Sequence, residues 1–296
     1  MRRLFSTLSV AALIAAAVTT PAAAHEASAP CSLQPGSVLA SGAQNNGGIT
    51  VGYPPRTVGL PGPIFDVFDP GRVRLSTSFT SDAHDNWGAT NHGWVVAGDS
   101  LYYREYSIDT MNEIRTDQPN EMRRVGGGWS NFTAVEVSEL TTRTTGYGLR
   151  SDGTLFRWGV VAWTWKATGS APGFAAVKSM ALISKTPTYD TFLANTRGGA
   201  LYTIRIPVSS PMKPIVKPVR TRTWQGFEKL LASKCGNYGT LLVGIDKDTS
   251  TAHTYAVGRA NGTATVINHL AVSTVSNDPV HFRWGGIPSI DPLNGD

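Results

Sequence analysis

The densest group of side chains that could do chemistry lies between residues 82 and 92. Asp82, His84 and Asp85 are close together in the chain, and His92 follows them. Carboxylates and imidazoles bind divalent metals or transfer protons. A metal site usually takes three or four ligands at defined spacing, and this segment shows no such spacing, so we expect no metal. The segment is then a polar binding or acid–base site, or a solvated loop before a strand.

A second candidate is a pair of tryptophans, Trp163 and Trp165, separated by one residue. In a strand, alternate side chains share one face, so the two indoles would form a flat apolar surface. The C–H face of a sugar ring can stack on such a surface, and the indole N–H adds a donor. Trp87 and Tyr103 are weaker candidates for the same role. The alternative is that Trp163 and Trp165 pack between neighbouring units of the fold.

The strong catalytic signatures are missing from the sequence. It contains no H-E-x-x-H, no G-x-S-x-G, no P-loop and no G-x-G-x-x-G motif after a strand. This favours a binding protein over an enzyme and implies no cofactor. The alternative is a glycosidase-like hydrolase with acids or a metal at the mouth of a channel, because glycoside hydrolysis needs two carboxyl groups that the fold brings together.

An internal repeat indicates how these residues are positioned. Charged residues make up 16% of the 296-residue chain, below the usual value of about 25%. Short apolar runs separated by turn residues recur, and their closing aromatics are spaced by 54, 46 and 53 residues: Tyr102, Phe156, Tyr202 and Tyr255. Two such runs around a turn form a β-hairpin. Repeats of about 50 residues built from short antiparallel strands predict a β-propeller.

One repeat carries a family resemblance. Residues 147–159, YGLRSDGTLFRWG, resemble the repeat of the regulator of chromosome condensation family. In architecture the chain is also similar to tachylectin-like secreted propeller lectins. Both resemblances imply an all-β propeller, here of five to six blades, with seven degenerate blades as the alternative. His281-Phe282-Arg283-Trp284-Gly285 echoes residues 155–159, and we expect this segment to form a strand shared with the N-terminal segment, which would close the ring.

The N-terminus predicts export. Arg2 and Arg3 precede a short uncharged apolar run, and small residues precede a cleavage position after Ala24. We therefore expect a signal peptide at 1–24, a single propeller domain at 25–296 and a secreted protein. Cleavage would reduce the net charge from +5 to +3, which is weak support for nucleic-acid binding. Cys31 and Cys235 then predict one disulfide.

Together these features predict a secreted, monomeric propeller that recognises a glycan or another extracellular ligand, such as a protein, through its surface loops. We expect no nucleic-acid partner, and no membrane association once the signal peptide is removed. The glycosidase-like hydrolase remains the alternative.

Overall fold

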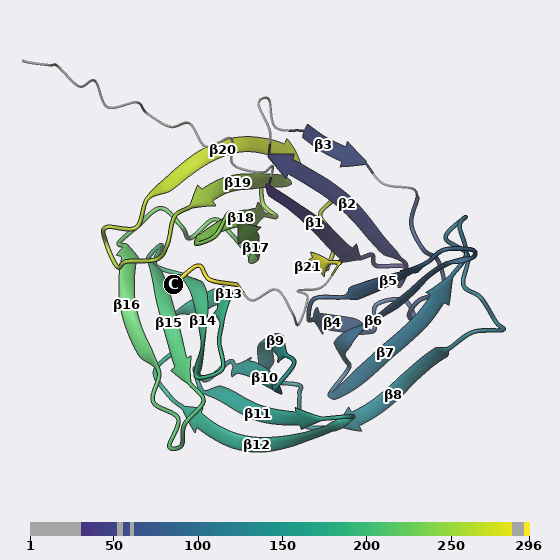
Figure 1. The fold of residues 1–296 in the computed structure, drawn as a ribbon, viewed down its shortest axis with the longest axis horizontal. Helices are drawn as coiled ribbons and strands as arrows, with labels where there is room; N and C mark the ends of the chain where they lie inside the picture. The colour runs from purple at the N-terminus through teal and green to yellow at the C-terminus, as the bar shows by residue number, and fades with distance from the viewer. Residues whose placement is uncertain (1–30, 52–55, 60–61, 286–292) are drawn as a thin grey trace, which may run out of the picture.

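The described part of the chain is a ring of five β-sheets, seen along its axis in Figure 1. The structure is a computed structural model that describes residues 31–51, 56–59, 62–285 and 293–296. The predicted signal peptide, residues 1–24, lies outside the described residues. The described residues contain no helix, and so none that is long and apolar enough to cross a membrane. The all-β propeller prediction is confirmed, with five blades.

Each blade is an antiparallel sheet whose innermost strand faces the centre of the ring. From the centre outward, the strands are, in blade 1, β21 (Val280–Trp284), β1 (Cys31–Val38), β2 (Gln44–Val51) and β3 (Arg56–Gly59); in blade 2, β4 (Val73–Ser76), β6 (Gly88–Ala97), β7 (Ser100–Ile108) and β8 (Asn120–Gly126); in blade 3, β9 (Phe132–Leu140), β10 (Arg143–Arg150), β11 (Leu155–Val161) and β12 (Thr164–Ala171); in blade 4, β13 (Val177–Lys185), β14 (Tyr189–Thr196), β15 (Leu201–Pro207) and β16 (Ile215–Arg220); and in blade 5, β17 (Lys229–Cys235), β18 (Gly239–Asp246), β19 (Thr251–Val257) and β20 (Ile267–Thr274). Blade 2 has an extra arm, β5 (Thr80–His84), which pairs with β6.

The sequence repeat matches the blades strand for strand. The four closing aromatics lie in β7, β11, β15 and β19, each of which is the third strand of its blade. Four blades also share a close contact between an aromatic ring and a glycine of the second strand. A Cβ on that glycine would lie 2.6–2.8 Å from the ring, and the pairs are Phe282 with Gly36, Phe79 with Gly93, Phe132 with Gly148 and Phe227 with Gly244. Only glycine leaves room for the ring there, so the repeat is a packing rule.

The ring closes through strands from both ends of the chain. β21 pairs antiparallel with β1, from Gln34 with Trp284 to Val38 with Val280. This confirms the expected shared strand. Its echo of residues 155–159 is not structural, because Phe156 lies in a third strand and Phe282 in an innermost one.

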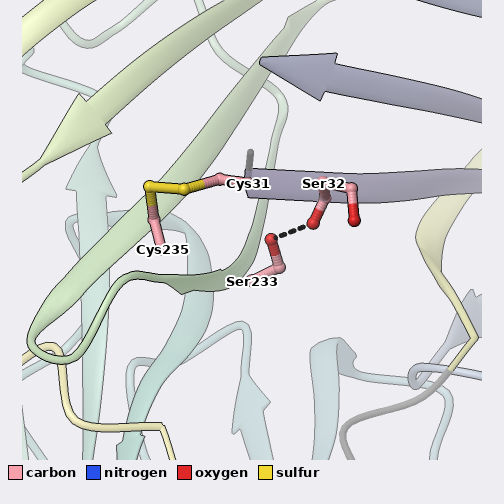
Figure 2. The surroundings of a disulfide bond; sticks show 4 residues. All are labelled: Cys31, Ser32, Ser233 and Cys235. Carbon is pink, nitrogen blue, oxygen red and sulfur yellow. Dashed lines mark hydrogen bonds between the residues drawn. A yellow bond between two sulfur atoms is a disulfide. The ribbon is translucent and has the colours of Figure 1, made fainter. Parts of the chain in front are cut away.

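A disulfide reinforces the closure between blades 1 and 5. Cys31 of β1 bonds to Cys235 of β17, 204 residues away, as predicted (Figure 2). Beside it, the Ser233 hydroxyl donates to the Ser32 carbonyl at 2.7 Å. A disulfide is compatible with a secreted protein.

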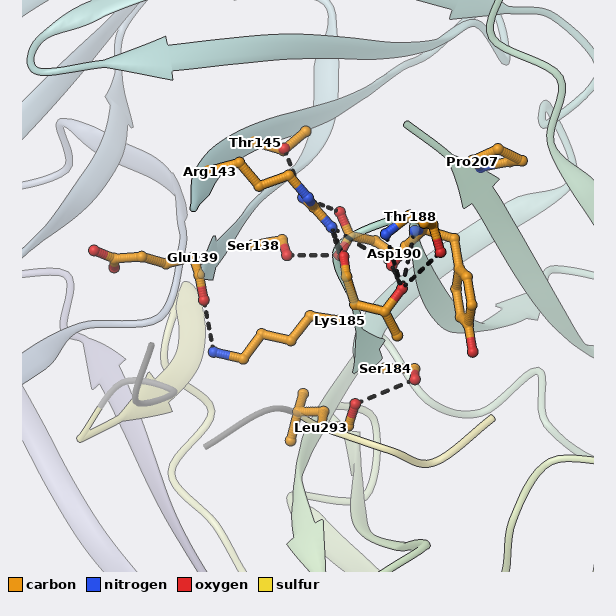
Figure 3. A network of polar contacts seen from close by, with 12 residues as sticks. Ser138, Glu139, Arg143, Thr145, Ser184, Lys185, Thr188, Asp190, Pro207 and Leu293 are labelled. Atoms are coloured by element: carbon orange, nitrogen blue, oxygen red, sulfur yellow. Dashed lines mark hydrogen bonds and ion pairs between the residues drawn. The ribbon is translucent and has the colours of Figure 1, made fainter. Parts of the chain in front are cut away.

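A buried ion pair joins blades 3 and 4 (Figure 3). The fully buried Asp190 carboxylate accepts from the Arg143 guanidinium at 2.7 and 2.8 Å. The Ser138 and Tyr147 hydroxyls also donate to it, at 2.7 and 2.6 Å. The final residues pack nearby, where the Ser184 hydroxyl donates to the Leu293 carbonyl at 3.2 Å.

Replacing both cysteines with serine should destabilise the fold by up to about 5 kcal/mol, because the unfolded chain regains the entropy that a 204-residue loop closure removes. Urea unfolding of the Cys31→Ser/Cys235→Ser variant would measure this loss. Ser233→Ala, which removes only the adjacent hydrogen bond, should cost about 1 kcal/mol. Equal stability of the oxidised protein and the double variant would contradict the expectation.

Asp190→Ala should cost about 3–5 kcal/mol in urea unfolding, since it leaves the Arg143 guanidinium largely buried without its carboxylate. The matched control is Asp117→Ala, which breaks an ion pair with Arg115 whose carboxylate side chain is 63% exposed. That change should cost at most about 1 kcal/mol. Similar losses in the two variants would show that burial does not set the strength of the pair.

Candidate functional site

The β5 arm and blade 2 bring several of the predicted site residues onto one surface. Thr80 pairs with His92, His92 with Glu105 and Trp94 with Tyr103. Because side chains alternate between the faces of a sheet, Asp82, His92, Glu105 and Tyr103 lie on the same face. The segment around residue 82 is therefore a paired hairpin arm that places its polar side chains at fixed positions, and not a long irregular loop.

This surface, together with the neighbouring turn of blade 3, forms what we call the blade 2–3 patch. It consists of Asp82, His92, Tyr103, Glu105, Arg123 and Trp163. Its contacts are continuous from end to end. The His92 Nε2 atom lies 3.3 Å from the Asp82 carboxylate, and the Tyr103 ring lies 6.0 Å from the His92 ring and 5.6 Å from the Trp163 ring. The Arg123 guanidinium lies 5.1 Å above the Trp163 ring.

Electrostatics keep the Tyr103 phenol protonated. Burial raises its pKa well above the usual value, and the Glu105 carboxylate raises it further by its charge and by accepting the phenol hydrogen bond at 3.1 Å. Tyr103 therefore acts as a donor that orients Glu105, and it does not act as a base. The second carboxylate oxygen of Glu105 has no recorded partner in the described residues.

The two tryptophans have different environments. Trp163 lies in the two-residue turn between β11 and β12, so the two indoles do not share a strand face as expected. Its side chain is 43% exposed. Trp165 is in β12 and packs at the blade interface against Trp94, Trp129 and Trp158, with ring centroids 5.4–5.8 Å apart. A Cβ on Gly146 would overlap the Trp165 ring, so Trp165 occupies the packing alternative.

The remaining predicted residues form a separate group at the tip of the β5 arm. The exposed His84 ring stacks on Trp87 at 4.1 Å, and its Nε2 atom lies 3.0 Å from the Thr90 hydroxyl. The Arg115 guanidinium covers the Trp87 ring at 4.9 Å. Asp85 is exposed in the turn beside them. His84 and Asp85 therefore do not join Asp82 and His92 in one centre.

Sequence reasoning missed Glu105 and Arg123. Their signal was present in the alternation of β7 and β8, but the pairing of these strands with one another and with β6 had to be known first.

It also missed a cavity of about 170 Å³ between blades 1 and 5, whose lining includes Ser37, Asn46, Asp278 and His281. The Ser37 hydroxyl donates to Asp278 at 2.6 Å, and the Asn46 Oδ1 and His281 Nε2 atoms are buried without a partner among the described residues.

The described residues contain no group of three or more His, Cys, Asp or Glu side chains that could hold a metal ion.

The fold and its surface define the class of protein as a five-bladed β-propeller. No family model matches the chain, and no curated protein matches it. The resemblance of residues 147–159 to the regulator of chromosome condensation family therefore has no support from a family model, although these residues form the β10–β11 hairpin.

Solved structures share the fold. An alpha-L-arabinofuranosidase from Podospora anserina, in complex with cellotriose, is 14% identical with a TM-score of 0.46, over 75% of this chain and 77% of that one. The Aleuria aurantia lectin, in complex with Fucalpha1-6GlcNAc, is 13% identical with a TM-score of 0.41, over 79% and 72%. A lectin from Burkholderia pseudomallei is 18% identical with a TM-score of 0.39, over 81% and 65%.

The different environments of the two tryptophans predict different losses of stability. Trp165→Ala should cost about 3–5 kcal/mol, because it empties a buried position between blades. Trp163→Ala should cost about 1 kcal/mol or less, since the indole is partly exposed. Urea unfolding followed by circular dichroism would compare the two variants, and an equal loss would contradict the assignment of Trp165 to packing.

Proposed function

We propose that this protein is a secreted binding module that recognises glycans through the blade 2–3 patch. The observation that carries the proposal is the exposed Trp163 indole beside Tyr103 and Arg123, with oriented carboxylates a few ångströms further along the same surface. Sugars present apolar C–H faces and hydroxyl edges, so their recognition combines an aromatic surface with planar polar side chains.

Each member of the patch has a role in this proposal. The Trp163 ring stacks on the sugar face. The open oxygen of Glu105 accepts from a sugar hydroxyl, and the Arg123 guanidinium donates to a sugar oxygen at the rim. Because Tyr103 holds Glu105 through its hydrogen bond, the acceptor is oriented before the ligand arrives, which lowers the entropic cost of binding.

The partners of the carboxylates favour binding over hydrolysis. Asp82 is paired with His92, Glu105 with Tyr103, and Glu121 with Arg123 at 2.9 Å. A retaining or inverting glycosidase needs one carboxylic acid that donates a proton and one carboxylate that attacks or activates water. Carboxylates held by neighbouring donors are suited to accepting hydrogen bonds from a ligand.

The export component rests on other features. The basic and apolar N-terminus has the layout of a signal peptide. The disulfide across the ring closure fits an oxidising compartment.

A panel of oligosaccharides and polysaccharides tests the proposal by calorimetry. Trp163→Ala should weaken binding of the ligand found by at least tenfold, or about 1.4 kcal/mol, while Trp163→Phe should retain most of the affinity. Glu105→Gln should also weaken binding, because the acceptor oxygen loses its charge.

The matched control is Tyr238→Ala in blade 5. Tyr238 is 57% exposed and lies under the Arg259 guanidinium at 5.3 Å, so it copies the Trp163 environment away from the patch. Its replacement should leave affinity unchanged. Binding that survives Trp163→Ala would refute the site, and turnover of any panel member would favour the hydrolase alternative.

A further inference from the structure

The central channel of the ring carries an unusual excess of positive charge. One end opens into a cavity of about 160 Å³. Its described lining residues include four cations, Arg74, Lys178, Lys229 and Lys247, and one acid, Glu228. Deeper in the channel, Lys229 and Ser76 also line a narrower section with Arg283 and Glu136. The two sections are therefore continuous.

Three of the cations at the mouth have protein partners. The Arg74 guanidinium donates to the Gly98 and Trp129 carbonyls at 2.8 and 2.7 Å. The Lys178 ammonium pairs with Glu228 at 2.6 Å, and the Lys247 ammonium donates to the Pro279 carbonyl at 2.7 Å. The other Glu228 oxygen accepts from the Lys247 backbone N–H at 2.7 Å. Glu228 is thus already engaged on both oxygens.

Lys229 and Arg283 lack such partners. The Nε and Nη1 atoms of Arg283 are buried and make no hydrogen bond with any described residue. No hydrogen bond or ion pair of the Lys229 ammonium is found in the described part of the chain. Buried guanidinium N–H groups without acceptors are costly, so the channel presents donors that a ligand can satisfy.

Glu136 neutralises only part of this charge. Its carboxylate accepts from the Val137 and Ser78 N–H groups at 3.0 and 3.5 Å, and it attracts both Lys229 and Arg283. One carboxylate therefore faces two cations.

The proton affinities reflect the same excess. Burial lowers the pKa of Lys229 and lowers that of Arg283 to about 10, although Glu136 opposes both shifts. Burial, with the charges of Lys247 and Lys229, lowers the pKa of His281 to about 4, so His281 is neutral at pH 7.

We propose that the central channel binds a doubly charged oxyanion, sulfate or phosphate, between Lys229 and Arg283. The guanidinium fork matches two oxygens of such a group, and the ammonium supplies a second charge. The five cations and two acids along the channel give a net charge of +3, which favours a dianion over chloride. A cavity of about 160 Å³ has room for such a group with water, since one water occupies about 30 Å³.

This site is separate from the proposed glycan site. Its mouth is lined by residues at or near the starts of the innermost strands, such as Lys178, Lys229 and Val280. The blade 2–3 patch lies on the β5 arm, beyond the far end of β4 (Figure 1). The oxyanion is either a free ion or an ester group on a larger molecule such as a sulfated sugar.

Titration of the full chain with sodium sulfate or sodium phosphate, in chloride buffer of constant ionic strength, tests the proposal by calorimetry. We expect saturable binding of one ion per chain, weakened at least tenfold in Lys229→Met and in Arg283→Met. Lys213→Met is the matched control, because Lys213 is exposed in blade 4 away from the channel. Glucose 6-sulfate against glucose separates the sources: tight binding of the ester alone indicates an esterified ligand, and binding of the inorganic ion alone a free one.

Urea unfolding provides a second readout that does not depend on detecting heat. Without sulfate, each Met variant should be as stable as the unmodified protein or more stable, since one cation then balances Glu136. With saturating sulfate the order should reverse. The general salting effect of sulfate acts on all variants alike, so the difference reports the site.

The proposal is overturned if no saturable binding is found, or if Lys213→Met weakens it as much as the channel variants. It is also overturned if both Met variants are less stable with and without sulfate, because Lys229 and Arg283 would then be structural partners of Glu136. If Arg283→Met does not fold, Lys229→Met carries the comparison.

Discussion

The whole arrangement depends on the pairing of β21 with β1. A propeller blade buries its faces only against neighbouring blades, so an open array would leave two blades half covered and two sheet edges unpaired. Here the sheet that closes the ring takes its innermost strand from residues 280–284 and its outer strands from residues 31–59. The disulfide between β1 and β17 adds a covalent link across the same boundary. The positions of every innermost strand, and so the shape of the channel, follow from this closure.

The two proposed sites use opposite electrostatic strategies on this frame. In the blade 2–3 patch each carboxylate is held by a neighbouring donor, so its direction is fixed and its charge is largely compensated. In the channel, charge is left uncompensated because five strands converge on a space too narrow for their long side chains to find partners. A surface suited to neutral polar ligands and a cavity suited to anions thus arise from the same sheets.

The sequence was informative where a residue's role repeats from blade to blade. The closing aromatics, the Asp152-Gly153 turn and the two cysteines each act through local geometry or simple parity, so the propeller, the hairpin and the disulfide could be predicted. The blade number could not be, because β5 and the shared strand β21 disturb the spacing. The site was recovered in part. Trp163 and Trp165 look equivalent in the chain, and only the turn before β12 separates an exposed indole from a buried one.

The seam also constrains the order in which the molecule can be made. A ribosome delivers β1, β2 and β3 first, yet their innermost partner arrives after nearly 230 more residues. Blades 2 to 5 are contiguous and can complete themselves as they emerge, whereas the β1 edge must wait unpaired. During that interval the Cys31 thiol would lack its partner and the exposed edge could pair with another chain. Blade 1, the first to be synthesised, is therefore the last to be finished, and any chaperone that attends this protein has most to protect there.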